Sequence, residues 1–177
     1  MVTVISGTHR VNSNTLKISK IYESIIKEKS NEEVKLFSLV EFSEQLSMKD
    51  LYQYHHPSLQ KIIDEYILNS DKIIIVAPEY NGTFPGILKL FIDSIRPELF
   101  KNKKIALVGV ATGRGGNLRG LDQLTNAFHY LGAEILSHKL PLSRINETIF
   151  PKDKENKDLL AALEVQLKYQ FDLLLKF

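Results

Sequence analysis

Near the N-terminus, short polar side chains surround an arginine directly after a short apolar segment. Residues 6–15 contain Gly7, Arg10 and a run of hydroxyl and amide side chains: Thr8, Asn12, Ser13, Asn14 and Thr15. A phosphate group binds where hydrogen-bond donors, positive charge and close backbone approach coincide, and hydroxyls, a guanidinium and helix N–H groups supply them. These residues therefore predict a phosphate site, although the same polar turn also suits a helix N-cap at Ser13 or Asn14.

A second segment that could do chemistry, residues 78–86, places an aromatic residue and an Asn-Gly turn between two prolines. The prolines stiffen the loop, and Tyr80 offers a flat wall beside backbone amides. Such a loop suits a planar heterocycle that needs hydrogen bonds at its edge and a contact on its face. The alternative is a plain strand-to-helix turn, in which Asn81 and Gly82 supply the turn geometry and Pro85 begins the helix.

A third segment, residues 112–117, is rich in glycine and reads Thr-Gly-Arg-Gly-Gly-Asn. Its three glycines expose backbone N–H groups and permit positive φ angles. Arg114 would place a cation near a developing negative charge. The alternative is a flexible surface loop whose arginine is solvated, the commoner environment of a single loop arginine.

Several familiar nucleotide and metal motifs are absent. The first loop has one glycine, so it is not the G-x-G-x-x-G loop of dinucleotide-binding domains. Gly115 and Gly120 have the separation of a Walker A loop, but Leu121 stands where that motif requires lysine, which disfavours a nucleoside triphosphate. There is no cysteine, and the five histidines have no metal-ligand spacing, so we predict no metal site.

The segments that position these loops alternate between strand-like and helix-like patterns of apolar residues. Strands are predicted at 2–6, 34–39, 72–77, 104–111 and 134–138. Helices are predicted at 14–29, 57–67, 86–95, 117–131 and 155–175, whereas 41–56 is the least regular stretch. The run Ile73, Ile74, Ile75 and Val76 leaves no polar face, which is typical of a parallel strand covered on both sides.

Five strands alternating with five helices predict one α/β domain over residues 1–177, with helices on both faces of a doubly wound parallel sheet. Five strands fit the flavodoxin-like order 2-1-3-4-5 better than a six-stranded dinucleotide fold. Ligands of such sheets bind beyond the carboxyl ends of the strands. The three loops described above follow the first, third and fourth strands, so we expect them to meet at one edge.

The overall composition argues against nucleic-acid and membrane partners. The 177 residues are 44% hydrophobic and 25% charged with a net charge of +2, too little for a nucleic-acid footprint. The longest aliphatic run, 73–77, is far too short to span a bilayer, and the first residues lack a secretory-signal pattern. We therefore expect a soluble cytoplasmic protein, and the absence of cysteine fits a reducing compartment.

Taken together, the three loops resemble those of the NADPH-dependent FMN reductase family of flavodoxin-like proteins. The family pattern G-S-x-R-x-x-S corresponds here to residues 7–13, with Thr8 in place of the serine. The longer pattern P-E-Y-N-G-S-x-P-G-x-L-K-N-x-I-D corresponds to residues 78–93, with Leu90 in place of the asparagine. The order and spacing of the elements agree over nearly the whole chain.

The resemblance implies roles for particular residues. The FMN phosphate would be held by Thr8, Arg10, Ser13, Asn14 and Thr15. The isoalloxazine ring would be lined by Pro78, Glu79, Tyr80, Asn81 and Gly82, and approached from the other side by Thr112, Gly113, Arg114, Gly115 and Gly116. No side chain is assigned as catalytic, because the redox chemistry belongs to the cofactor.

The resemblance also implies a reaction and partners. The expected activity takes electrons from NADPH or NADH through FMN to a small-molecule acceptor such as a flavin, quinone or azo compound, by a ping-pong mechanism. A flavodoxin-type electron carrier and a binding module that has lost flavin are the alternatives. The near-neutral charge disfavours the carrier, and the polar first loop disfavours the module. A response-regulator receiver is disfavoured because Ile5 and Ser6 stand where it needs acidic residues.

The helix predicted at 86–95 points to self-association. Its apolar residues surround most of the circumference, so a face would be exposed unless another subunit or the segment 41–56 covers it. The resembling family forms homodimers, and we expect a homodimer or tetramer. The aromatic and histidine residues of 41–56 are candidates for shaping the acceptor site.

Overall fold

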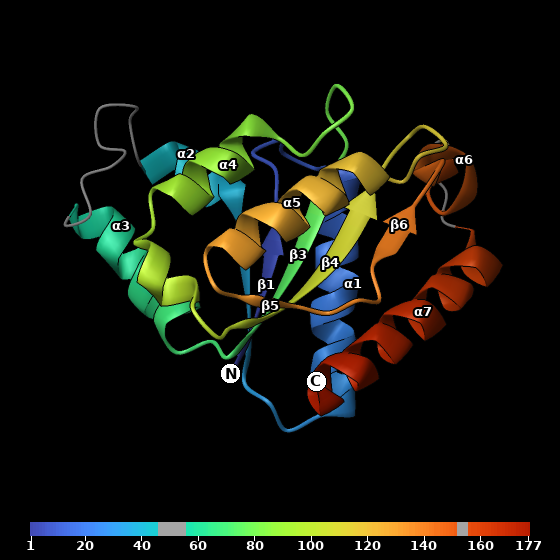
Figure 1. The fold of residues 1–177 in the computed structure, drawn as a ribbon. Helices are drawn as coiled ribbons and strands as arrows, with labels where there is room; N and C mark the ends of the chain where they lie inside the picture. The colour runs from blue at the N-terminus through green and yellow to red at the C-terminus, as the bar shows by residue number, and fades with distance from the viewer. Residues whose placement is uncertain (46–55, 152–155) are drawn as a thin grey trace.

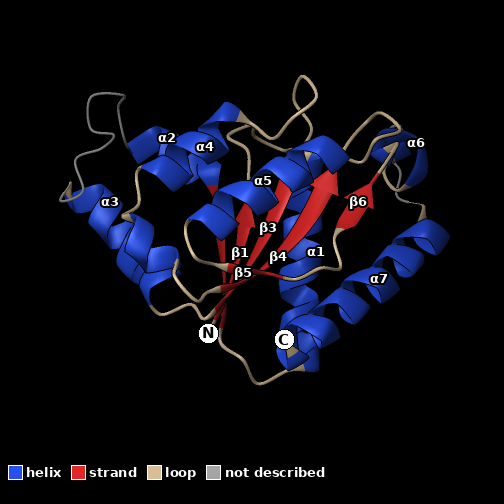
Figure 2. Cartoon of the chain, viewed as in Figure 1, coloured by secondary structure: helices blue, strands red, loops and turns tan. Residues whose placement is uncertain are grey.

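The computed structural model describes residues 1–45, 56–151 and 156–177, which form a parallel sheet between two layers of helices (Figures 1 and 2). Strands β1 (Val2–Ser6), β2 (Val34–Ser38), β3 (Lys72–Pro78), β4 (Lys104–Val110) and β5 (Glu134–Ile135) lie in the order β2-β1-β3-β4-β5. All the strand pairs are parallel. The sheet confirms the predicted fold class and strand order.

The two faces of the sheet carry different helices. Helices α1 (Asn14–Lys29) and α7 (Lys157–Lys176) cover one face (Figure 1). The other face carries α2 (Leu39–Gln45), α3 (Pro57–Ile62) with a π-helical continuation (Ile63–Leu68), α4 (Gly86–Asp93), a 3₁₀ turn (Pro97–Phe100) and α5 (Leu118–Tyr130). The segment 41–56 is therefore helical at its start, and its residues 46–55 lie outside the described part of the chain.

The sheet separates two hydrophobic cores because side chains alternate along each strand. Ile73 and Ile75 of β3 pack with α2 to α5, whereas Ile74 and Val76 pack with α1 and α7. Leu88, Phe91 and Ile92 of α4 are also buried inside the chain, where Phe91 contacts Phe42 of α2 with their ring centroids 5.3 Å apart. The apolar circumference of α4 is thus covered largely by its own subunit.

The fifth position of the sheet differs from the prediction. A single strand over 134–138 was expected, but β5 stops at Ile135 and a second short strand, β6 (Leu140–Leu142), pairs with the other end of β4. Pro141, expected in a connector, lies in β6 opposite Gly109, an edge position where its missing N–H costs no ladder bond. A short helix, α6 (Ile145–Thr148), follows β6 and was not predicted.

A side chain fills the gap between β5 and β6. Gln170 of α7 is fully buried, and its Nε2 donates to the carbonyl oxygens of Leu107 (3.1 Å) and His138 (2.8 Å). Its Oε1 accepts from the hydroxyl of Tyr22 at 3.0 Å, and burial, with Asp172 nearby, raises the pKa of that hydroxyl above its ordinary value. Gln170 therefore supplies the hydrogen bond that a continuous fifth strand would have given to Leu107.

Candidate functional site

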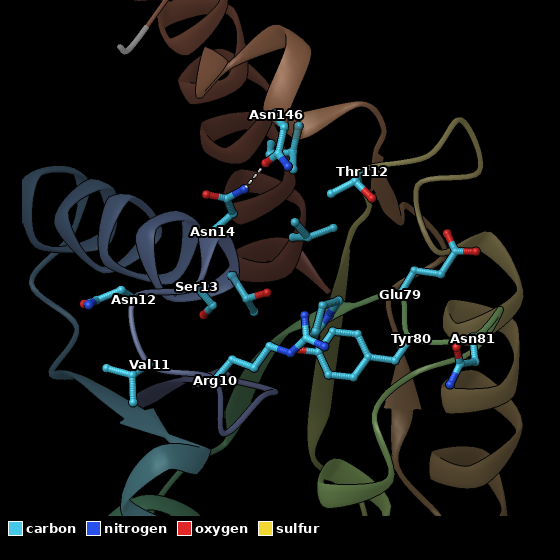
Figure 3. A pocket seen from close by; sticks show the side chains of 14 residues that line it. Arg10, Val11, Asn12, Ser13, Asn14, Glu79, Tyr80, Asn81, Thr112 and Asn146 are labelled. Carbon is cyan, nitrogen blue, oxygen red and sulfur yellow. Dashed lines mark hydrogen bonds between the residues drawn. The ribbon is translucent and has the colours of Figure 1, made fainter. Parts of the chain in front are cut away.

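The predicted loops meet at the carboxyl ends of the strands and enclose a cavity of about 580 Å³ (Figure 3). Nine residues expected at the site line it: Arg10, Ser13, Asn14, Thr15, Pro78, Glu79, Tyr80, Asn81 and Thr112. The remaining lining residues are Val11, Asn12, Val110, Ile145 and Asn146. The doubly wound topology thus brings three loops, together with the start of α6, to one opening.

One end of the cavity is the start of α1. Ser13 caps this helix, because its Oγ accepts from the backbone N–H of Leu16 at 3.1 Å. The N-cap interpretation of the first loop is therefore correct, but it leaves the hydroxyl hydrogen of Ser13 able to donate. The N–H groups of Asn14 and Thr15 belong to the first turn, where no carbonyl of the helix can accept them. This end offers several donors and a positive helix terminus to an anion.

Arg10 and Tyr80 form the middle of the wall. The guanidinium carbon of Arg10 lies 4.4 Å from the centroid of the Tyr80 ring, and Figure 3 shows the side chain extended across the ring. Such a cation–π contact orients the arginine without neutralising its charge. The hydroxyl of Tyr80 is hydrogen-bonded to Thr8 Oγ1 at 2.6 Å. Thr8 is fully buried and does not line the cavity, so here its hydroxyl fixes Tyr80.

The loop after β3 is held in a defined shape. Asn81 and Gly82 have φ angles of 53° and 81°, and Tyr80 N–H donates to the Thr83 carbonyl at 2.8 Å, the geometry of a tight Asn-Gly turn. The base of the loop is fixed by Asn117, whose Nδ2 donates to the carbonyl oxygens of residues 77 and 78 at 3.0 and 3.1 Å. The backbone N–H of Asn117 donates to Glu79 Oε2 at 3.1 Å.

The residues of the Gly-rich loop after β4 differ in whether they line a cavity. Gly113, Arg114 and Gly115 line a second cavity of about 280 Å³, together with Gly82. This cavity shares the residues Glu79, Asn81 and Thr112 with the first, so the two adjoin. Gly116 lines neither cavity. Its φ is +56°, and a Cβ there would lie 2.7 Å from the carbonyl carbon of Pro141, so this glycine serves packing.

Two of the five lining residues that sequence reasoning missed, Ile145 and Asn146, come from α6, an element that was not predicted. Asn14 Nδ2 donates to Asn146 Oδ1 at 2.5 Å, and this bond joins the start of α1 to α6 beside the cavity (Figure 3). The signal that could have found this region is the spacing of Leu140 and Leu142, which is the two-residue period of a strand. A loop following such a strand would have been expected at the same edge of the sheet as the other three.

Within the ranges that the structure describes, no three His, Cys, Asp or Glu side chains come together as metal ligands. In the same ranges, no helix is long and apolar enough to cross a membrane.

A family model described as NADPH-dependent FMN reductase matches residues 1–147 of the chain. The matched stretch contains every residue that lines the first cavity. The chain belongs to the NADPH-dependent FMN reductase family. This match confirms the family that the loop motifs predicted. The only complete helix outside the matched residues, among those that the structure describes, is α7.

Curated relatives include the FMN-dependent NADPH-azoreductase of Staphylococcus aureus, 28% identical over 116 residues. That match covers 62% of this chain and 60% of the relative, so the chain is matched over less than two thirds of the azoreductase. A flavoenzyme NAD(P)H:(acceptor) oxidoreductase from Paracoccus denitrificans has the same fold, with a TM-score of 0.73, 23% identity and coverage of 99% and 97% of the two chains. A flavodoxin from Fusobacterium nucleatum bound to flavin mononucleotide gives a TM-score of 0.59 at 14% identity, covering 99% of this chain and 96% of the flavodoxin.

Proposed function

We propose that this member of the family is an FMN-dependent NAD(P)H oxidoreductase that passes electrons to a small-molecule acceptor. The observation that carries the proposal is a single cavity with an anion-binding end at α1 and a stiff aromatic loop at Tyr80. The azoreductase name of the curated relatives supports the same activity. We further propose a ping-pong reaction and a cytoplasmic location, the latter supported by the absence of cysteine from the sequence.

The residues present fit FMN. Its phosphate needs a cation and several donors, and Arg10, Ser13 and the N–H groups of Asn14 and Thr15 provide them. The volume of about 580 Å³ lies inside the range of about 300–1,000 Å³ usual for small-molecule sites.

When bound, FMN supplies the two-electron redox chemistry. The chain's own part is to bind and orient. Arg10, Ser13 and Asn14 would hold the phosphate, and Thr8 would keep Tyr80 and hence Arg10 in place. Residues 78–81 and Thr112 would line the ring, with their backbone amides available to negative charge on it. Thr8 and Gly116 thereby keep a role in the site without contacting the cofactor.

An electron carrier of the flavodoxin type is the alternative function, because a flavodoxin has the same fold. An absorption spectrum of the purified protein separates the two. FMN is added, excess is removed, and NADPH or NADH is mixed in without oxygen. We expect bound flavin whose absorption bleaches within seconds. Flavin bands that persist would support the carrier, and a protein that retains no flavin after titration would contradict both functions.

We also propose that the protein forms a homodimer through α4 and α5. A mainly apolar cavity of about 410 Å³ lies between them, lined by Ile92, Ile95, Pro97, Ala127, Tyr130 and Leu131 and by the paired charges of Lys89 and Asp93. At its rim, Tyr130 is 91% exposed, the most exposed large hydrophobic residue among the described residues. A protruding ring next to an apolar hollow is self-complementary, because a two-fold axis places each ring over the partner's hollow. A second copy of this chain is therefore the occupant that fits.

Tyr130→Asp tests the dimer. We expect the wild-type protein to elute as a dimer in size-exclusion chromatography with light scattering, and the variant to shift to monomer at the same micromolar concentration. The variant should dissociate because the substitution places a charge in an apolar contact and removes the aromatic ring that fills it. Tyr169→Asp, which changes a 55% exposed tyrosine on α7, should leave the mass unchanged. A monomeric wild type would contradict the proposal.

A further inference from the structure

The short helix α6 reaches the first cavity from outside the three predicted loops, and its start is tied to the Gly-rich loop after β4. The backbone N–H of Arg144 donates to the Gly113 carbonyl at 2.9 Å, and the N–H of Ile145 donates to the Ala111 carbonyl at 3.0 Å. These two bonds fix where the next residue, Asn146, stands along the cavity wall.

Side chains also join this segment to α1. Asn14 Nδ2 donates to Asn146 Oδ1 at 2.5 Å, and Nζ of Lys17 lies 4.8 Å from the centroid of the Phe150 ring, shortly after α6. Phe150 and Ile145 are buried, so the segment is anchored on both sides of the exposed Asn146. Asn146 is therefore held between the first turn of α1 and the Gly-rich loop.

The side-chain amide of Asn146 keeps an unused donor. Its Oδ1 accepts from Asn14, and in the described part of the chain no acceptor is bonded to its Nδ2. Figure 3 shows Asn146 at the edge of the cavity, between Asn14 and Thr112. Arg10 and Tyr80 lie across the cavity from it (Figure 3). The two hydrogens of this amide are thus available to a ligand in the cavity.

We propose that Asn146 binds the ribityl chain of the flavin, the hydroxyl-bearing chain that joins its phosphate to its ring. The inference rests on one part of the proposed function, namely that FMN occupies this cavity. In that proposal the phosphate lies at the start of α1, and the ring lies beside residues 78–81 and Thr112. Asn146 stands between these two ends, so the ribityl chain is the part of FMN that faces it. Hydroxyl oxygens of that chain accept hydrogen bonds from an amide.

The test uses a series of flavins on protein from which bound flavin has been removed. Lumiflavin is the ring alone, riboflavin adds the ribityl chain, and FMN adds the phosphate. Quenching of flavin fluorescence gives each Kd without any turnover. For Asn146→Ala, we expect the Kd of riboflavin and that of FMN to rise about fivefold, the effect of losing one uncharged hydrogen bond. The Kd of lumiflavin should keep its wild-type value.

Two control variants separate a contact with the flavin from support of the cavity. Glu147→Ala changes the next residue of α6, which is exposed and does not line the cavity, so every Kd should match that of the wild type. Lys17→Met removes the cation over Phe150, the other link between α1 and this segment, and should leave the Kd of riboflavin unchanged. Urea denaturation should show that Asn146→Ala unfolds at the wild-type midpoint, because Asn146 is exposed.

Other patterns of binding overturn the proposal. A loss confined to FMN would mean that Asn146 acts on the phosphate through Asn14. An equal loss with all the flavins, shared by Lys17→Met, would mean that the segment only shapes the cavity. Unchanged Kd values would remove Asn146 from the site, and a wild-type protein that binds no flavin would refute the proposal together with FMN as the cofactor. Flavin that binds but is not bleached by NADPH or NADH refutes the proposed activity alone.

Discussion

Replacing Arg10 with alanine is expected to weaken FMN binding by about 1.5–3 kcal/mol, which is about a 10- to 150-fold rise in Kd. The range is that of a hydrogen bond to a charged group. Arg10 lines the cavity beside the start of α1, and its guanidinium carbon lies 4.4 Å from the centroid of the Tyr80 ring, which orients it. Quenching of flavin fluorescence during titration of FMN with the protein measures the change directly.

Riboflavin provides the control for this prediction, because it has the ring of FMN and lacks the phosphate. Arg10→Ala should leave riboflavin affinity close to that of the wild type, and Arg10→Lys should recover part of the FMN affinity. Equal loss with both flavins would mean that Arg10 supports the ring or the Tyr80 loop. Unchanged FMN affinity would remove Arg10 from the phosphate site.

Gln170→Leu is expected to lower the free energy of unfolding by about 3 kcal/mol, because each buried group left without a partner costs about 1–3 kcal/mol. The substitution introduces an apolar side chain of similar size. It leaves the carbonyl oxygens of Leu107 and His138 and the hydroxyl of Tyr22 without their hydrogen-bond partner. Urea denaturation followed by circular dichroism measures the change.

A matched control lies one turn earlier on the same helix. Gln166 is exposed, so Gln166→Leu should change stability by less than about 0.5 kcal/mol, as surface substitutions usually do. Tyr22→Phe should fall between the two variants, since it removes a single bond of the group. If Gln170→Leu unfolds at the same urea concentration as Gln166→Leu, the break between β5 and β6 needs no support from α7.

The elements that could be read from the sequence are those with strong local signals. Helix α1 begins at Asn14 and ends at Lys29 as predicted, because Ser13 caps it and its apolar residues recur at helical spacing. The strand β3 is also clear from its unbroken apolar run, and the order of strands follows from the alternation of elements. The three loops were found for the same reason, since each follows a recognisable strand.

The parts that the sequence did not reveal depend on distant contacts. Asn117 was expected as the first residue of a helix, but it adopts φ = 64° and is the N-cap of α5, because its side chain bonds to the backbone of residues 77 and 78. The bond of the Thr8 hydroxyl to Tyr80, 72 residues away, could not be foreseen from the sequence. The two-residue strand β5 is too short to show a period. Beyond its end, the carbonyl of Leu107 in β4 accepts its hydrogen bond from Gln170 of α7.

The bond between Asn14 and Asn146 joins residues 132 positions apart, and it has a consequence for how the protein matures. A cavity whose wall begins at residue 10 and closes at residue 146 can form only after most of the chain has been synthesised and folded. A ligand of this cavity therefore selects the completed fold and adds to its stability by mass action, by about 2.7 kcal/mol at 100 times Kd. Cofactor supply would thus set how much of the newly made protein survives proteolysis.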